Sequence, residues 1–164
     1  HVDDGYLGGK RQGIRGRGAH GKMPFITALS LVNGRPAQLK RSIVPNFTRS
    51  SIGNWAQTAL LGPCTLYSDR FLGLAGLKSD EITPNPAAKD QLFQEINTIM
   101  GNLKRYLLGI HHAIRVDNLA RYLAAFTWRF NHRYDLKQAF QDGLNCIKAT
   151  RPLALKSLRH VLYT

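Results

Sequence analysis

The sequence predicts a mixed α/β domain. Three observations support this fold class: strand-like apolar segments fill the first third of the chain, another short apolar strand follows a helix, and the second half shows helical periodicity. The chain has 164 residues, of which 43% are hydrophobic and 20% charged, the size and composition of one globular domain. Three strands, a helix, a fourth strand and then helices suit a mixed sheet covered by helices.

The first three strands are expected to form an antiparallel meander. Val2–Leu7 alternates loosely between apolar and polar residues, and Phe25–Val32 is apolar and partly β-branched. Asn33 and Gly34 favour a tight hairpin turn, and Gln38–Val44 is the expected third strand. Because the opening residues already resemble the interior of a strand, we expect the chain to be a fragment that lacks an upstream segment.

A flexible basic loop is expected to separate the first two strands. Residues 8–22 contain six glycines and five Lys or Arg residues among fifteen positions. Because glycine has more conformational freedom than any other residue, this composition predicts a flexible segment rather than a packed element.

A helix and a fourth strand are expected next. Asn46–Leu61 carries apolar residues at helical spacing, and Gly62 followed by Pro63 ends the helix. Cys64–Asp69 is predicted to be a short buried strand that ends on an acidic residue. A further short strand is expected at Glu81–Thr83, in a segment that holds two prolines.

The rest of the chain is expected to be helical. Ala88–Leu108, Val116–Asn131 and Asp135–Ala149 each carry one apolar stripe at a spacing of three or four residues, which is typical of amphipathic helices. In the last of these helices the stripe consists of Leu136, Ala139, Phe140, Leu144 and Ile147.

The charge of the chain points to nucleic acid. Lys and Arg total 23 against 10 acidic residues, a formal net charge of +13, and a surface this basic attracts polyanions. No apolar run reaches the length of a membrane span, and no secretory signal opens the chain. Cys64 and Cys146 are far apart and form no CxxC motif, so we expect two small buried residues rather than a zinc site.

Two acidic residues stand on strands that a mixed sheet can place side by side. Asp3 lies in the first predicted strand and Asp69 ends the fourth. Two carboxylates held close together repel each other unless a divalent cation binds between them, and hard oxygen ligands select Mg²⁺ or Mn²⁺. Alternatively, Asp3 caps a turn and Asp69 is a loop residue, which are the more common roles of such residues and the ones that composition alone favours.

A third polar group is expected from the predicted helix over residues 88–108. Asn97 and Lys104 are seven residues apart, so they share one face of that helix and offer a neutral oxygen ligand and a positive charge for phosphate. Asp90, on the same face, and Glu95 are alternative third ligands. Asn97 and Lys104 can also simply face solvent.

Six short motifs resemble, in the same order, those of one family of bacterial insertion-sequence transposases. The family patterns are a V-D-E-x-Y-x-G-G-K opening, a basic Gly-rich run, Y-T-D, I-E/N…L-K-R, Y-H-H and F-x-x-R-F-N-x-R. Each motif alone is weak, whereas the ordered series over residues 2–133 is much stronger. The matching segments here are Val2–Lys10, Arg15–Gly18, Tyr67–Asp69, Ile96–Arg105, His111-His112 and Phe126–Arg133.

This resemblance implies a DDE-type transposase catalytic domain with a ribonuclease-H-like fold. Asp3, Asp69 and Asn97 would then bind two Mg²⁺ or Mn²⁺ ions, and Lys104 would contact DNA near the transferred end. The implied reaction is hydrolysis at the 3′ ends of the element, after which the freed 3′-OH attacks target DNA. The sequence differs from the family pattern at Asp4, where Glu is usual, at Gly5, where Thr is usual, and over residues 79–95.

The resemblance also implies the partners of the chain. They are double-stranded DNA, from the element ends and the target, and further copies of the chain on that DNA, in a prokaryotic cytoplasm at the nucleoid. We expect one domain over residues 1–164, without the upstream DNA-binding module usual in the family. The residues expected to contact DNA are Lys10, Arg11, Arg15, Arg17, Lys22, Lys104, Arg105, Arg129 and Arg133.

Two other functions compete with this hypothesis. One is a catalytically decayed transposase relative that only binds nucleic acid, which the differences around Asn97 favour. The other is a basic structural protein that binds nucleic acid, which explains the charge but not the ordered motifs.

Overall fold

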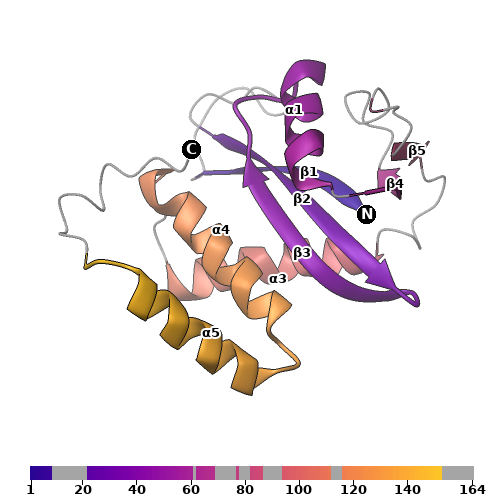
Figure 1. The fold of residues 1–164 in the computed structure, drawn as a ribbon. Helices are drawn as coiled ribbons and strands as arrows, with labels where there is room; N and C mark the ends of the chain where they lie inside the picture. Colours follow the sequence, from indigo (N-terminus) through magenta and orange to yellow (C-terminus); the bar gives the residue numbers. More distant parts are fainter. Residues whose placement is uncertain are drawn as a thin grey trace.

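The computed structural model describes residues 1–8, 22–60, 62–68, 77, 82–86, 94–111 and 116–152. These ranges form one five-stranded sheet and four helices (Figure 1). None of the helices in these ranges is long and apolar enough to cross a membrane. The elements are β1 (Val2–Leu7), β2 (Met23–Val32), β3 (Arg35–Ile43), α1 (Arg49–Ala59), β4 (Cys64–Ser68), β5 (Ile82–Pro86), α3 (Gln94–Ile110), α4 (Val116–Asn131) and α5 (Leu136–Ala149).

The sheet has the strand order β3-β2-β1-β4-β5. β1, β2 and β3 pair antiparallel, β4 joins β1 in parallel, and β5 joins β4 in parallel. Three antiparallel strands followed by a parallel fourth strand beside the first are the ribonuclease-H-like arrangement. The predicted mixed α/β fold class is therefore confirmed, including the contact between the first and fourth strands.

The β2–β3 hairpin turns where the sequence predicts. Asn33 and Gly34 have φ angles of 51° and 72°, the left-handed conformation that a two-residue type I′ turn requires at both positions. β3 begins at Arg35, three residues earlier than predicted, and so includes Pro36. Proline cannot donate a hydrogen bond to a neighbouring strand, but β3 is an edge strand, where this loss is tolerated.

α1 packs on one face of the sheet. It begins where the Thr48 hydroxyl accepts a hydrogen bond from the Ser51 amide. It ends at Ala59, shortly before Gly62, which has a φ of 72°. The helix buries three side chains against the strands: Ile52, Trp55 and Ala56 pack with Val2, Ile26, Val44 and Leu66.

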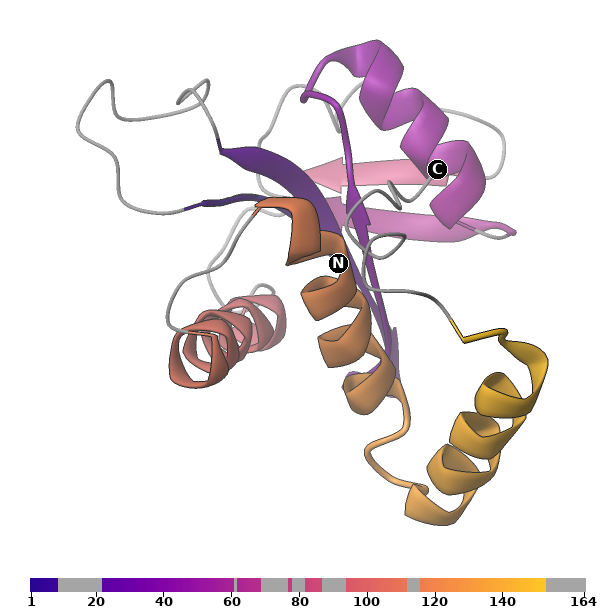
Figure 2. The ribbon, with the colours of Figure 1, turned by 90° about the vertical axis from the view of Figure 1, so that its left-hand side faces the viewer.

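α3 and α4 cover the opposite face, as Figure 2 shows. Phe25 of β2 packs with Leu103 of α3 and Leu119 of α4, and Leu29 packs with Ile99. α4 has the predicted bounds, and α3 is described from Gln94, so residues 88–93 of the predicted helix lie outside the described residues.

The end of α4 is tied to the outer edge of β3. The Asn131 side chain accepts a hydrogen bond from the Leu39 amide at 2.8 Å and donates one to the Leu39 carbonyl at 2.9 Å. The Arg133 guanidinium donates to the carbonyl oxygens of Pro36 and, at 3.1 Å, of Ala37. These side chains satisfy backbone groups that an edge strand otherwise leaves open.

α5 lies apart from the sheet (Figure 2). Its Leu136, Phe140 and Ile147 side chains are 77%, 64% and 72% exposed, whereas Ala139 is buried. Cys146 is also exposed on this helix, so the prediction that both cysteines are buried is wrong, and Cys64 is only half-buried.

Candidate active-site cleft

Asp3 lies in β1 on the face that α3 covers. It is opposite Thr27 of β2, which in turn is opposite Arg41 of β3, so the three residues form one row across the sheet. The Thr27 hydroxyl donates to the sulfur of Met100 in α3, which fixes the face of this row. The Asp3 carboxylate accepts a hydrogen bond from the Asp4 amide at 2.9 Å.

A cleft of about 250 Å³ lies between β1 and α3. Asp3 lines it from the strand, and Asn97, Gly101 and Lys104 line it from the helix, at successive spacings of four and three residues. The predicted shared face of Asn97 and Lys104 is therefore confirmed, and both side chains are exposed. The cleft brings a carboxylate, an amide and an ammonium group to one opening.

Gly5 of β1 lies against the side chains of Phe25 in β2 and Met100 in α3. A Cβ atom at Gly5 would lie 2.7 Å from the ring of Phe25 and 3.0 Å from the Met100 methyl group. The glycine thus makes room for these two side chains, which also line the cleft. A Thr at this position, the residue usual in the resembling family, would collide with these two side chains as they stand.

Asp69 and Asp90 lie outside the described residues. The residue before Asp69, Ser68, is described and pairs with Val2, the residue before Asp3. Glu95, the other alternative ligand, is half-buried on α3 and is not among the residues that line the cleft.

The chemistry of the cleft fits a hard divalent cation. In the described part of the chain, no three carboxylate, imidazole or thiol groups come together. The cleft nevertheless combines the Asp3 carboxylate with the Asn97 amide oxygen, and oxygen donors of both kinds bind Mg²⁺.

The predicted DNA-contacting residues fall into three groups. Lys22, Lys104, Arg105 and Arg129 are described and exposed, and the Arg129 guanidinium stands 5.4 Å from the centre of the Tyr106 ring. Arg133 is engaged with backbone carbonyls at the β3 edge, as described above. The remaining four, Lys10, Arg11, Arg15 and Arg17, lie outside the described residues.

Arg41 is half-buried and has buried terminal nitrogens, which the sequence did not predict. Burial lowers its pKa to about 10. Its Nε donates to Thr27 at 3.4 Å, and its guanidinium lies 4.5 Å from the centre of the Phe126 ring. Within the described ranges, its two terminal nitrogens are buried without a hydrogen-bond partner. Strand alternation with buried Leu39 is the signal that could have placed Arg41 inside.

A larger cavity, of about 730 Å³, lies beside the start of β1 and along β4. Leu29, Leu39 and Leu66 contribute to its walls, and none of the described residues that line it is acidic. Its lining therefore offers no carboxylate for metal binding or acid–base chemistry, unlike the smaller cleft.

Comparison with known proteins gives one match. The family model described as an ISXO2-like transposase domain matches residues 1–131. No curated protein and no solved structure matches the chain.

Proposed function

Because the chain belongs to the family of ISXO2-like transposase domains, we propose that it cuts the ends of an insertion sequence and joins them to target DNA. The observation that carries this proposal is the cleft that joins Asp3 of β1 to Asn97 and Lys104 of α3. In the proposed site Asp3, Asp69 and Asn97 hold Mg²⁺ or Mn²⁺. The pairing of Val2 with Ser68 supports this set, because Asp3 and Asp69 follow these two residues.

The bound metal would supply Lewis-acid activation of the attacking oxygen and of the phosphate. The protein residues do the positioning. The Asp4 amide orients the Asp3 carboxylate, and the Lys104 ammonium, at the mouth of the cleft, binds phosphate oxygens next to the reacting bond. Gly101, which carries no side chain, leaves room for a DNA strand between Asn97 and Lys104.

The proposed chemistry needs no external energy source. Water first displaces the 3′ oxygen of the element end from its phosphate. The freed 3′ oxygen then forms a bond to a target phosphorus while the bond from that phosphorus to its own 3′ oxygen breaks. One phosphodiester bond replaces another, so the protein need only align the two oxygens in line and neutralise charge.

The proposed DNA surface combines basic residues from several parts of the chain. Lys22, Arg105 and Arg129 contribute exposed positive charge, and the basic run with Lys10, Arg11, Arg15 and Arg17 follows β1 in the sequence. Such residues contact phosphates without reading bases, so they would position duplex DNA rather than select its sequence. We further propose that two or more copies assemble on the element ends.

The test is Mn²⁺-dependent cleavage and strand transfer of duplex DNA that carries the element ends. Asp3→Asn should lower the rate at least about 100-fold, because it removes a proposed metal ligand. Asp117→Asn, an exposed acidic residue of α4 that does not line the cleft, is the matched control and should retain most of the activity. Mn²⁺ binding measured by calorimetry should weaken in Asp3→Asn and not in Asp117→Asn.

A decayed, non-catalytic DNA-binding relative is the second candidate, favoured by the poor family match over residues 79–95. Equal cleavage by the wild type and Asp3→Asn, together with normal DNA binding, would establish that function instead. Binding without any preference for element ends would favour a basic structural protein.

A further inference from the structure

We propose that α5 is an interface between two copies of this chain. Its exposed apolar stripe, formed by Leu136, Phe140, Gly143 and Ile147, would bind the same stripe on the second copy with the two helices antiparallel. The segment lies beyond residues 1–131, so it stands outside the region that the transposase domain family shares.

The stripe is apolar and open to solvent. Its members are spaced by four, three and four residues, which places them on one face of the helix. Leu136, Phe140 and Ile147 are each more than 60% exposed. Three large apolar side chains on one helix face exceed the scattered exposure normal for a surface and mark a candidate interaction site.

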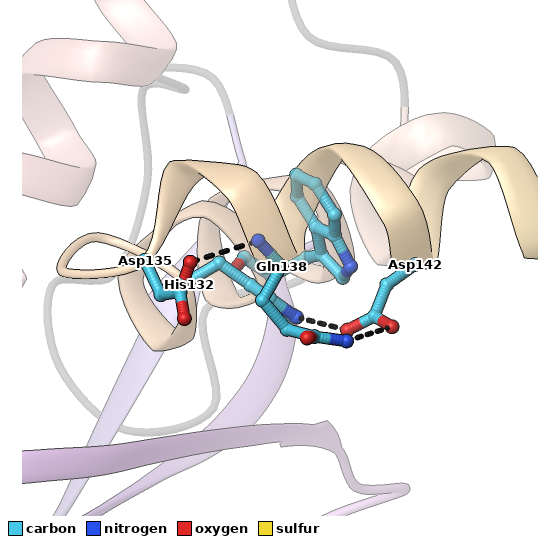
Figure 3. A network of polar contacts seen from close by, with 5 residues as sticks. His132, Asp135, Gln138 and Asp142 are labelled. Atoms are coloured by element: carbon cyan, nitrogen blue, oxygen red, sulfur yellow. Dashed lines mark hydrogen bonds and ion pairs between the residues drawn. The ribbon is translucent and has the colours of Figure 1, made fainter.

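One flank of α5 contacts the residue that follows α4, and two further hydrogen bonds lie within α5 and its cap (Figure 3). His132 contacts the Asp142 carboxylate at 3.1 Å, and Gln138 donates to the same carboxylate at 2.8 Å. Asp135 caps the helix by accepting from the Gln138 amide at 2.8 Å. Asp142 is not part of the stripe, so its contact with His132 leaves the stripe open to solvent.

The sizes of the side chains favour a second copy in the antiparallel orientation. Reversing the direction of one helix leaves the four-three-four spacing unchanged. Leu136 then faces Ile147 of the partner, and Phe140 faces Gly143 of the partner. A Cβ atom at Gly143 would meet nothing within 4 Å, so the position is open, and the missing side chain leaves a hollow between its neighbours on the stripe that could take the phenyl ring of the partner. A parallel pair would instead oppose two Phe140 rings and leave a void at the glycines.

The charges of this segment also allow two copies to meet. The chain carries +13, so most of its surface repels a second copy. Residues 135–149 contain two acidic residues, Asp135 and Asp142, and two basic residues, Lys137 and Lys148, a net charge of zero. Antiparallel pairing places Asp135 level with Lys148 of the partner. A helix that binds lipid instead carries an excess of Lys and Arg on its polar face.

The interface is small. One helix of 14 residues from each copy buries less than the roughly 1,200 Å² of the smallest standard interfaces, so the dimer should be weak and concentration-dependent.

Sedimentation velocity over a concentration series tests the surface. The wild type should shift from monomer to dimer as its concentration rises, and Phe140→Asp should stay monomeric. Gly143→Leu should also stay monomeric, although it adds apolar surface, because it fills the hollow. Leu108→Asp is the matched control, since Leu108 is 67% exposed on α3, and it should dimerise normally. A monomeric wild type at all concentrations, or dimers of Phe140→Asp or Gly143→Leu, would overturn the proposal.

Disulfide trapping tests the orientation. In a Cys64→Ser, Cys146→Ser background, mixed Leu136→Cys and Ile147→Cys proteins should form the heterodisulfide between the two positions. The same positions on two antiparallel helices would be about 16 Å apart, at 1.5 Å per residue, so homodisulfides should be rare. Predominant homodisulfides would overturn the antiparallel arrangement.

Discussion

Gly5 shows how one missing side chain shapes the candidate cleft. Gly5→Thr should destabilise the protein by about 1–3 kcal/mol, because the new Cβ would lie 2.7 Å from the Phe25 ring. Phe25→Leu in the same chain should recover part of that loss, since it removes the atoms that collide. Urea unfolding of both single variants and the double variant measures this coupling. Purely additive effects would mean that the two residues do not contact each other.

Arg41 is expected to lower the free energy of unfolding. Burial lowers its pKa from 12.5 to about 10, which corresponds to roughly 3 kcal/mol against the charged form at neutral pH. The contact with the Phe126 ring offsets about 1–2 kcal/mol of this cost. Arg41→Met should therefore raise the free energy of unfolding by about 1 kcal/mol. Arg35→Met, at an exposed position of the same strand, should leave it unchanged, and a less stable Arg41→Met protein would contradict the prediction.

The contact between α4 and α5 should depend on pH through His132. The pKa of His132 is raised, first by its hydrogen bond to the Trp128 carbonyl and further by Asp142. Only the protonated ring donates from both nitrogens, so it alone satisfies both acceptors. Because the folded-state pKa is raised, the stabilisation is complete below the unfolded value of about 6.5 and is lost as pH rises through the folded value.

NMR titration of the His132 ring measures this effect. The midpoint should lie above 6.5 in the wild type, and Asp142→Asn should lower it only in part, because the Trp128 carbonyl remains. His132→Gln should reduce the difference in melting temperature between pH 5.5 and pH 8.5. An unchanged His132 midpoint in Asp142→Asn would show that the Asp142 carboxylate does not raise the pKa of His132.

At the scale of elements, the closing F-x-x-R-F-N-x-R signature has a structural role that its sequence does not reveal. The resemblance suggested a DNA contact for Arg133, yet its guanidinium donates to the carbonyls of Pro36, Ala37 and Phe130. An arginine after a helix looks the same in sequence whether it meets phosphate or a sheet edge. Arg105 and Arg129 are exposed, so their contact with DNA stays a prediction that mutation can test.

At the scale of the whole molecule, the fold could be predicted because local signals agreed with one another. The Asn33-Gly34 turn, the apolar, partly β-branched run of β2 and the stripe of α4 each specify one structure, and each is observed. The proximity of Asn97 and Lys104 followed from helical spacing, whereas their approach to Asp3 depended on sheet topology and on the resemblance.

Other features could not be predicted because they depend on which elements pack against a given side chain. Periodicity shows that α5 has an apolar face, but it does not say what covers it, so the exposure of Leu136 and Cys146 was not foreseen. Gly101 lies between Asn97 and Lys104 in the cleft, but a glycine gives no chemical signal of its own. Arg41 was missed because a charge count treats every cation as a surface charge.

The sealed edge of β3 has a consequence for where this domain ends. The family match stops at residue 131, but the guanidinium that covers the carbonyls of Pro36 and Ala37 belongs to Arg133. A protein trimmed at residue 131 would keep every proposed catalytic residue and Asn131, but the carbonyls of Pro36 and Ala37 at the edge of β3 would lose their partner. We therefore expect a piece that ends at residue 131 to associate through this edge more readily than one that includes Arg133.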